Sequence, residues 1–413
     1  MINSIHTKTG KVTIASILFS VVAIAFVFLI DIRHDGYIHR ATADVATTSV
    51  TVINIPPSWT VLAVESPAST TTSPTNDGSD VTFQATGTDG NGEDYYLLIC
   101  KNSNAPTPNA GAAPDCDAPT NQWAVSTSTA SGAVATATYT ASSSDAESEA
   151  WYAWICYANA GNPSCNGTFS GQESTADNKS PFNVNHRPTF TLFSDDSPTL
   201  PDGTTTWYAT SSDPDSDGGA DTVRLFVCKE NDFTGTNCGP GGSWATSTFV
   251  TSNPSATGTP AAPIQDINHT AYGFIVDEHG LVASGGAQGT DSILTVANVA
   301  PTVSNVTVNS GTIILTVEQG QSTGFAATLD VTDDNSCVAN GSTTDEILAS
   351  DINVYRSGIG SSSCQVSGTD YDPNHCYTGD LATTTWNVSC TQNAGTCTGP
   401  DDDAVTWTCT YEL

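Results

Sequence analysis

The sequence predicts an all-β protein, built as tandem β-sandwiches behind a single N-terminal transmembrane helix. Three observations support this prediction. Beyond residue 40, short alternating or β-branched runs are separated by Gly, Pro, Asn and Asp, and no segment has a sustained helical period. A unit in which an acidic turn leads into a strand ending in cysteine recurs along the chain. A long apolar run lies near the N-terminus.

The apolar run is Val12–Ile30, which has 19 residues and is preceded by lysines. About 20 apolar residues span a bilayer as a helix, whereas a signal-peptide core has roughly 7 to 15. An Ala-x-Ala cleavage motif at 41–43 lies 11 residues beyond the run, so we expect an uncleaved anchor, with cleavage as the alternative. The expected segments are a cytoplasmic N-terminus at 1–11, a transmembrane signal anchor at 12–30 and a juxtamembrane linker at 31–49.

The 12 cysteines all lie beyond residue 99. In a chain with an export signal, an even number of cysteines predicts a disulfide framework formed in an oxidising compartment. Their spacings do not fit the Cys-x2–4-Cys knuckles of a zinc site. We therefore expect a single-pass protein of the cell membrane whose C-terminal region is extracellular. Three close pairs are expected to be bridged, Cys100–Cys116, Cys156–Cys165 and Cys228–Cys238, and the pairing is left open for Cys337, Cys364, Cys376, Cys390, Cys397 and Cys409.

The recurring unit places an aspartate 11 residues before a cysteine, at Asp89, Asp145 and Asp217. The segment 271–280 resembles 151–157, with Val276 in place of the cysteine. We therefore expect two related hairpins in each domain. Strands B and C flank the first acidic turn of a domain, and strands E and F flank the second.

Two Asn-rich stretches that end in Pro-Thr, at 183–189 and 298–302, mark the expected domain junctions. Proline there stops one strand from running into the next domain. The last strand, 406–413, is strand E by its place in the repeat, so F and G are expected from a longer natural chain or from a partner that adds strands. The expected domains are 50–186, 187–299 and 300–413, the last incomplete at its C-terminus.

Charge excludes some partners. The chain has 43 acidic and 10 basic residues and a net charge of −33, although only 13% of its residues are charged. With so few cations it cannot neutralise many phosphates, so nucleic acid is excluded as a partner. An acidic surface of this kind resists non-specific association.

The Pro-Thr-Val-Ser start at 301–304, the turn at 213–218 and the strands leading to cysteine resemble large bacterial cell-surface proteins. These are built from tandem Ig-like modules of the PKD and cadherin-like kind, and the resemblance is strongest to the disulfide-bearing variety of uncultured, small-genome lineages. It covers most of 50–413 and implies Ig-like sandwiches at a cell surface. The chain lacks the inter-domain calcium set of cadherins, so the resemblance does not imply calcium-rigidified adhesion.

One acidic turn is a candidate calcium site. Carboxylates at alternate positions followed by a glycine at the sixth position resemble the start of a calcium loop, where hard oxygens surround one ion. The twelfth position is Arg224, so the turn is not an EF-hand. The alternative is a solvated turn, which Asp favours. Candidate ligands are Asp213, Asp215, Asp217 and Asp221, with weaker candidates at Asp89, Glu93 and Asp94 and at Asp145, Glu147 and Glu149.

No catalytic motif is recognisable in the sequence, and we expect neither an enzyme nor a cofactor beyond structural calcium. His279 follows two acidic residues at an expected strand end and is interpreted as a surface imidazole. Sequons at Asn166 and Asn305 indicate surface exposure. The tryptophans at 123, 151, 154, 244 and 386 are interpreted as core residues packing near disulfides, with a sugar-binding platform as the alternative.

Together these features predict a non-enzymatic, membrane-anchored extracellular protein with a structural or adhesive role. Its expected partners are the membrane, through the N-terminal helix, and a cell-surface protein or glycan, and its oligomeric state is open. The alternative is a carbohydrate-binding or carbohydrate-active surface protein whose catalytic module lies beyond residue 413.

Overall fold

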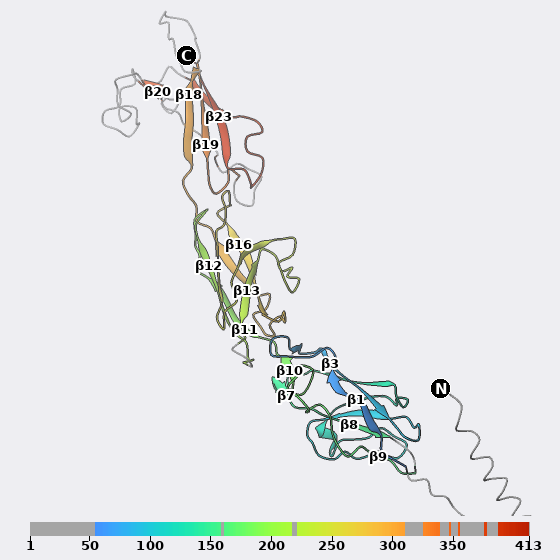
Figure 1. Ribbon diagram of the computed structural model, residues 1–413. Helices are drawn as coiled ribbons and strands as arrows, with labels where there is room; N and C mark the ends of the chain where they lie inside the picture. Colours follow the sequence, from blue (N-terminus) through green and yellow to red (C-terminus); the bar gives the residue numbers. More distant parts are fainter. Residues whose placement is uncertain are drawn as a thin grey trace, which may run out of the picture. The chain divides into compact units, whose positions relative to one another are not determined.

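The computed structural model describes residues 54–157, 161–216, 221–309, 325–338, 347, 354–355, 376–377 and 387–412. This part of the chain is all-β, with one short 3-10 helix at Pro119–Asn121 (Figure 1). The expected anchor at 12–30 lies outside the described residues. Among the residues described, no helix is both long and apolar enough to cross a membrane.

The first sandwich packs two sheets around one core. Phe83 from one sheet and Leu97 and Ile155 from the other are fully buried in the same cluster. One sheet has the order β1-β3-β6, formed by β1 (Ser58–Glu65), β3 (Asp80–Thr88) and β6 (Val134–Thr140). The other has the order β5-β4-β8-β9, formed by β5 (Gln122–Val125), β4 (Tyr96–Cys100), β8 (Tyr152–Tyr157) and β9 (Ser164–Cys165). A small third sheet, β2-β10-β7, is formed by β2 (Thr75–Asn76), β10 (Phe182–Asn185) and β7 (Ser148–Glu149).

This strand order is that of an Ig-like sandwich, in which A, B and E face C′, C, F and G. The turn at Asp89 joins β3 to β4, and the turn at Asp145 lies between β6 and β8. The two acidic turns are therefore flanked by strands B and C and by strands E and F, which confirms the hairpin assignment.

The second sandwich repeats this arrangement around a core that includes Phe190, Trp207 and Leu225. Strand β13 pairs with β16 as β4 pairs with β8. This pairing explains why the sequence at 271–280 resembles that at 151–157, because β16 and β8 both occupy the place of strand F in their sandwiches. The sheets are β11-β12-β15, formed by β11 (Thr189–Asp195), β12 (Thr205–Ser212) and β15 (Ser255–Gly258), and β14-β13-β16-β17, formed by β14 (Ser243–Thr246), β13 (Val223–Cys228), β16 (Asn268–Asp277) and β17 (Asp291–Thr295).

Within the described residues, the third group of strands contains one four-stranded sheet and one short pair of antiparallel strands. Strand β23 pairs with β19, as β6 pairs with β3, so it occupies the place predicted for strand E. Trp386 lies outside the described residues. The sheet β18-β19-β23-β22 is formed by β18 (Thr302–Val308), β19 (Phe325–Thr332), β23 (Ala404–Glu412) and β22 (Asn387–Gln392), and the pair by β20 (Val354–Tyr355) and β21 (Cys376–Tyr377).

The disulfides cover the outer face of the second sheet in each of the first two sandwiches. Strand β8 alternates, so that Ile155 enters the main core while Trp154 and Cys156 form a small cluster on the opposite face. Trp151 and Trp123 belong to the main core, which confirms the interpretation of these tryptophans as core residues. The bonds are the three predicted pairs, Cys100–Cys116, Cys156–Cys165 and Cys228–Cys238, together with Cys337–Cys397 and Cys390–Cys409, and no cysteine of the described part is free.

Candidate metal centre

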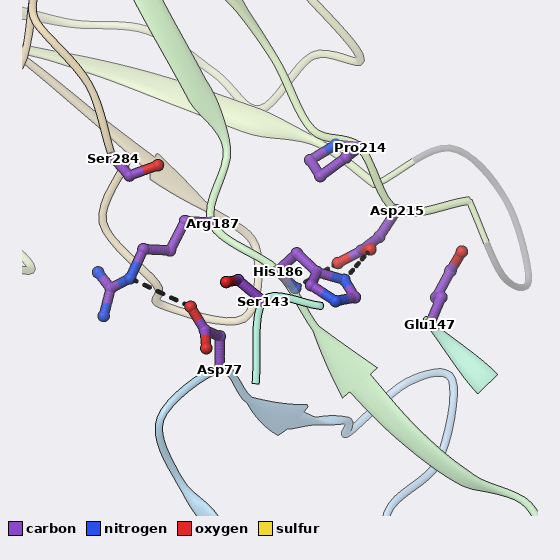
Figure 2. A pocket seen from close by; sticks show the side chains of 8 residues that line it. All are labelled: Asp77, Ser143, Glu147, His186, Arg187, Pro214, Asp215 and Ser284. Carbon is purple, nitrogen blue, oxygen red and sulfur yellow. Dashed lines mark hydrogen bonds and ion pairs between the residues drawn. The ribbon is translucent and has the colours of Figure 1, made fainter. Parts of the chain in front are cut away.

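The segment between the first and second sandwiches is held by the acidic turn that joins β12 to β13. The backbone N–H of His186 donates to Asp215 Oδ2, and His186 Nδ1 lies 2.6 Å from Asp215 Oδ1 (Figure 2). Arg187 Nε lies 3.6 Å from Asp77 Oδ2 in the same region. These groups line a pocket of about 520 Å³, to which Glu147 also contributes.

His186 is positively charged in this arrangement. Its Nε2 lies 3.1 Å from the carbonyl oxygen of Asp145, and its Nδ1 contacts the carboxylate of Asp215. Both partners are acceptors, so both ring nitrogens must carry a proton. Burial lowers the pKa of His186, but the hydrogen bond and the charge of Asp215 outweigh burial and raise it. The ion pair therefore neutralises one carboxylate of the turn and leaves the others unneutralised.

Three of the predicted calcium ligands converge. Asp213, Asp215 and Asp221 each offer one carboxylate oxygen within 4.8 Å of the others. Oδ1 of Asp213 accepts the N–H of Asp215 at 3.0 Å, as in an Asx turn. Its Oδ2 is buried and has no hydrogen-bond partner among the described residues. The fourth predicted ligand, Asp217, lies outside the described residues.

Asp277, at the end of β16, joins this group. It is 1% exposed, and its charge acts on Asp213. Asp277 accepts the N–H of Leu281 at 2.7 Å and a side-chain N–H of Asn185 at 3.0 Å. The sequence showed an acidic residue here but gave no reason to place it beside the turn at 213–221, because the pairing of β13 with β16 brings them together.

The side-chain oxygen of Asn185 is, like Asp213 Oδ2, buried without a hydrogen-bond partner in the described structure. The residue is fully buried, and its Nδ2 donates both hydrogens, to Asp277 Oδ2 at 3.0 Å and to Asn76 Oδ1 at 2.9 Å. The acceptor partners fix the orientation of the amide, so Oδ1 is the atom without a partner in the described structure. A buried carbonyl oxygen without a donor costs free energy, and a cation would satisfy it.

Burial and mutual repulsion disfavour the charged forms of these acids. Burial, together with the charges of the neighbouring carboxylates of Asp215, Asp277 and Asp221, raises the pKa of Asp213 to about 7. Burial also raises the pKa of Asp221, to about 6, although His279 opposes the change. The pKa of Asp277 is likewise raised by burial. The acidic side chains here therefore outnumber the cations near them, and their ionised forms lack compensating positive charge.

The donor set fits a hard divalent cation. Calcium takes carboxylate and amide oxygens at 2.3–2.6 Å. The carboxylate oxygens of Asp213, Asp215 and Asp221 lie within 4.8 Å of one another, which is close enough for all three to contact one such ion. The unpartnered Oδ2 of Asp213 would supply one of the ligands.

The weaker calcium candidates form hydrogen-bonded turns instead. Both carboxylate oxygens of Asp145 accept the hydroxyl of Tyr139 at 2.8 Å, and one of them also accepts the N–H of Ser142. Asp89 Oδ1 accepts the N–H of Asn91 at 2.7 Å, and although its Oδ2 is buried without a partner in the described structure, no second ligand group gathers around it there. Within the described residues, the two groups able to hold a metal ion both lie in the second sandwich.

Two exposure predictions are wrong. The side chain of His279 is only 13% exposed, because it packs against Asp221, so it is not a surface imidazole. Asn166 is 8% exposed, and its side chain accepts the N–H of Ile155 and donates to the carbonyl oxygen of Thr168, so this sequon lies inside the sandwich. Asn305 is exposed, as predicted.

A similar clasp, in which an Asx turn holds the backbone N–H of the preceding segment, occurs at the next junction, with an amide in place of the carboxylate that accepts this N–H. Asp333 Oδ1 accepts the N–H of Asn335 at 2.8 Å, which is the same Asx turn. The N–H of Val299, in the segment before β18, donates to Asn335 Oδ1. Asn335 therefore takes the place of Asp215, and Val299 that of His186. The first of these two junctions therefore has an ion pair, His186 with Asp215, where the second has a hydrogen bond to an amide.

Comparison with known proteins assigns no family to this chain. No family model and no curated protein matches the chain. Among solved structures it is similar to a marsupial T cell receptor, with 10% identity over 86% of this chain and 93% of the other and a TM-score of 0.32. An alpha-2-macroglobulin of E. coli in its native conformation matches with 11% identity over 63% of this chain and 16% of the other, at a TM-score of 0.19. TM-scores this low carry no argument about function, and the fold assignment rests on the sheets themselves.

Proposed function

We propose that this chain is a membrane-anchored extracellular protein of Ig-like modules with a structural or adhesive role, and that calcium stiffens its first junction. The disulfides support an oxidising compartment, since such bonds persist outside the cytosol. The apolar segment at 12–30 supports anchoring in a membrane. The proposed role requires no catalysis.

One observation carries the calcium proposal: carboxylates gather at the junction, and Asp213 Oδ2 among them is buried without a hydrogen-bond partner in the described structure. Asp213 and Asp221 come from the turn after β12, Asp277 from the end of β16, and Asn185 from the segment that leaves the first sandwich. An ion bound among them would link the second sandwich to that segment. It would also neutralise the mutual repulsion of these acids, so binding would stabilise the junction.

Calcium titration of the full-length chain tests this proposal. Calcium sites of extracellular modules typically bind with a Kd of 10⁻⁴–10⁻³ M. Adding 10 mM calcium to chelator-treated protein is then expected to stabilise it by about 1–3 kcal/mol, seen as a rise in the melting temperature. Magnesium at the same concentration should have less effect, because it requires tighter octahedral geometry.

A matched pair of variants makes the test specific. Asp213→Asn should abolish most of the calcium-induced rise, because it removes a ligand charge at the junction. Asp333→Asn changes the equivalent residue of the second junction and should keep the rise. If the wild-type protein shows no rise, or if Asp213→Asn keeps it in full, calcium does not bind at this junction.

The structural role is also supported by the placement of the aromatic residues. Trp123, Trp151 and Trp154 are at most 6% exposed, so they do not form a flat platform for a sugar ring. Anchoring is tested by membrane fractionation and by digestion of intact cells with an added protease. The proposal requires the chain to sediment with membranes and to be cleaved from outside. Recovery in the cytosolic fraction would contradict it.

A further inference from the structure

A second group of metal-binding side chains lies beside the calcium ligands. Asp221 lies two residues before the start of β13, and Glu278 and His279 immediately follow β16. The antiparallel register places Val223 opposite Asp277, so the start of β13 and the end of β16 lie together. Each of the three side chains offers one ligand atom within 4.8 Å of the other two.

His279 Nε2 faces two carboxylates but bonds to neither. It lies 3.7 Å from Asp221 Oδ2 and 3.8 Å from Glu278 Oε1. Hydrogen bonds between nitrogen and oxygen span 2.7–3.2 Å, so both separations are too long. Nε2 is nevertheless buried and has no hydrogen-bond partner within the described structure. A polar atom so placed indicates a ligand between it and the carboxylates.

We propose that Asp221, Glu278 and His279 bind Zn²⁺. Zinc takes imidazole nitrogen at 2.0–2.1 Å and carboxylate oxygen at 2.0–2.2 Å, in tetrahedral geometry. Ligand atoms around such an ion are about 3.4 Å apart, close to the 3.7 and 3.8 Å measured around Nε2. The imidazole distinguishes this group from the all-oxygen calcium set, because nitrogen ligands favour zinc and its neighbours over calcium.

The exposure of the three side chains suits a zinc site whose fourth coordination position is open to solvent. The Asp221 and His279 side chains are 10% and 13% exposed, whereas that of Glu278 is 41% exposed. Two ligands are therefore held in place by the sandwich, and the third closes the site from the solvent side. Thr222 Oγ1 donates to Glu278 Oε2, which leaves Oε1 directed at His279. Water from the solvent side would complete the tetrahedron.

The other junction histidine shows what a plain ion pair looks like here. His186 lies 2.6 Å from its aspartate, and both of its ring nitrogens have partners. His279, in contrast, leaves Nε2 unpaired between two carboxylates at a greater distance. The zinc proposal does not require calcium at the junction, because Asp221 has two oxygens and the nitrogen ligand belongs to the zinc set alone.

Zinc titration tests the proposal on the full-length chain, purified without a histidine tag and stripped with a chelator. Zn²⁺ alone, added in a calorimeter, is expected to bind with one equivalent per chain. Co²⁺ should give the intense visible bands of a tetrahedral ion. His279→Gln is expected to lower the zinc affinity at least tenfold and to abolish these bands.

Control variants separate this site from the calcium site and from loss of folding. His269→Gln removes a histidine that lies within β16, whose Nε2 contacts the carbonyl oxygen of Gln265, and should bind zinc as the wild type does. Glu278→Gln alters an exposed ligand and should weaken zinc binding without changing the melting temperature of the metal-free protein. Asp213→Asn should lose the calcium response but keep zinc.

The proposal is overturned if the wild type does not bind one equivalent of zinc, or if His279→Gln and Glu278→Gln bind it as tightly as the wild type. Loss of the calcium response with zinc binding intact would contradict only the proposed function. Loss of zinc binding with the calcium response intact would contradict only the zinc site.

Discussion

Glu65 makes the stability of the first sandwich depend on pH. Its side chain is buried at the end of β1, where Oε1 accepts the indole N–H of Trp151 at 2.8 Å, and Oε2 accepts the N–H and hydroxyl of Ser69 at 2.9 and 2.7 Å. The nearby ammonium of Lys179 is directed instead at the carbonyl oxygen of Ala63 and at Glu173. Burial raises the pKa of Glu65 from 4.5 to about 7, although its hydrogen bonds oppose the change.

The sign and size of the effect follow from this pKa. The folded protein binds a proton more tightly than the unfolded chain, so the stability from Glu65 is fully present below pH 4.5 and is lost as the pH rises through about 7. Each pH unit between the two pKa values is worth about 1.4 kcal/mol. The free energy of unfolding should therefore fall by about 3 kcal/mol across this window on account of this one group.

Urea unfolding of wild type and Glu65→Gln at a series of pH values, with chelator present, measures this loss. The amide of the variant does not titrate, so the difference between the two curves isolates Glu65 from the junction acids. The exposed Glu230→Gln serves as the control and should follow the wild-type curve. If wild type and Glu65→Gln change in parallel between pH 4.5 and 7.5, Glu65 is not the buried, easily protonated acid described above.

Two further predictions concern packing and cross-linking. Gly273→Ala places a methyl group 2.7 Å from the ring of Phe193, so it should lower the free energy of unfolding by about 1–3 kcal/mol in chemical denaturation, whereas Gly286→Ala, which meets nothing within 4 Å, should change it little. Replacing Cys228 and Cys238 by alanine opens a loop with a sequence separation of 10 and should cost about 2.7 kcal/mol by the loop-entropy relation. A change well below 1 kcal/mol in either measurement would contradict the packing or the loop-closure reasoning, respectively.

The sequence predicted the local features of this chain well. Alternation along β8 correctly separated Trp154 and Cys156 from Ile155, because neighbouring residues of a strand point to opposite faces. Close spacing correctly paired Cys228 with Cys238. These features depend on residues near one another in the chain, and the resemblance between strands F of two sandwiches was visible for the same reason.

Much less of the candidate site could be predicted from the sequence, because the site depends on contacts between distant segments. Asp213 and Asp221 share a turn and could be proposed together. Asp277 and Asn185 reach them only through the pairing of β13 with β16 and through the path of the segment after β10. His279 was misassigned to the surface because a strand end is often exposed, whereas here the same pairing places it against Asp221.

The two junctions explain why acidity alone was a poor guide to the site. Each has the same Asx turn and the same backbone clasp, yet one uses Asp215 with charged His186 and the other uses Asn335 with Val299. The backbone hydrogen bond that positions the segment therefore needs no charge. The extra carboxylates at the first junction are costly to bury and are not required by the clasp. They are best explained by a ligand that compensates their charge, which is the basis of both metal-binding proposals.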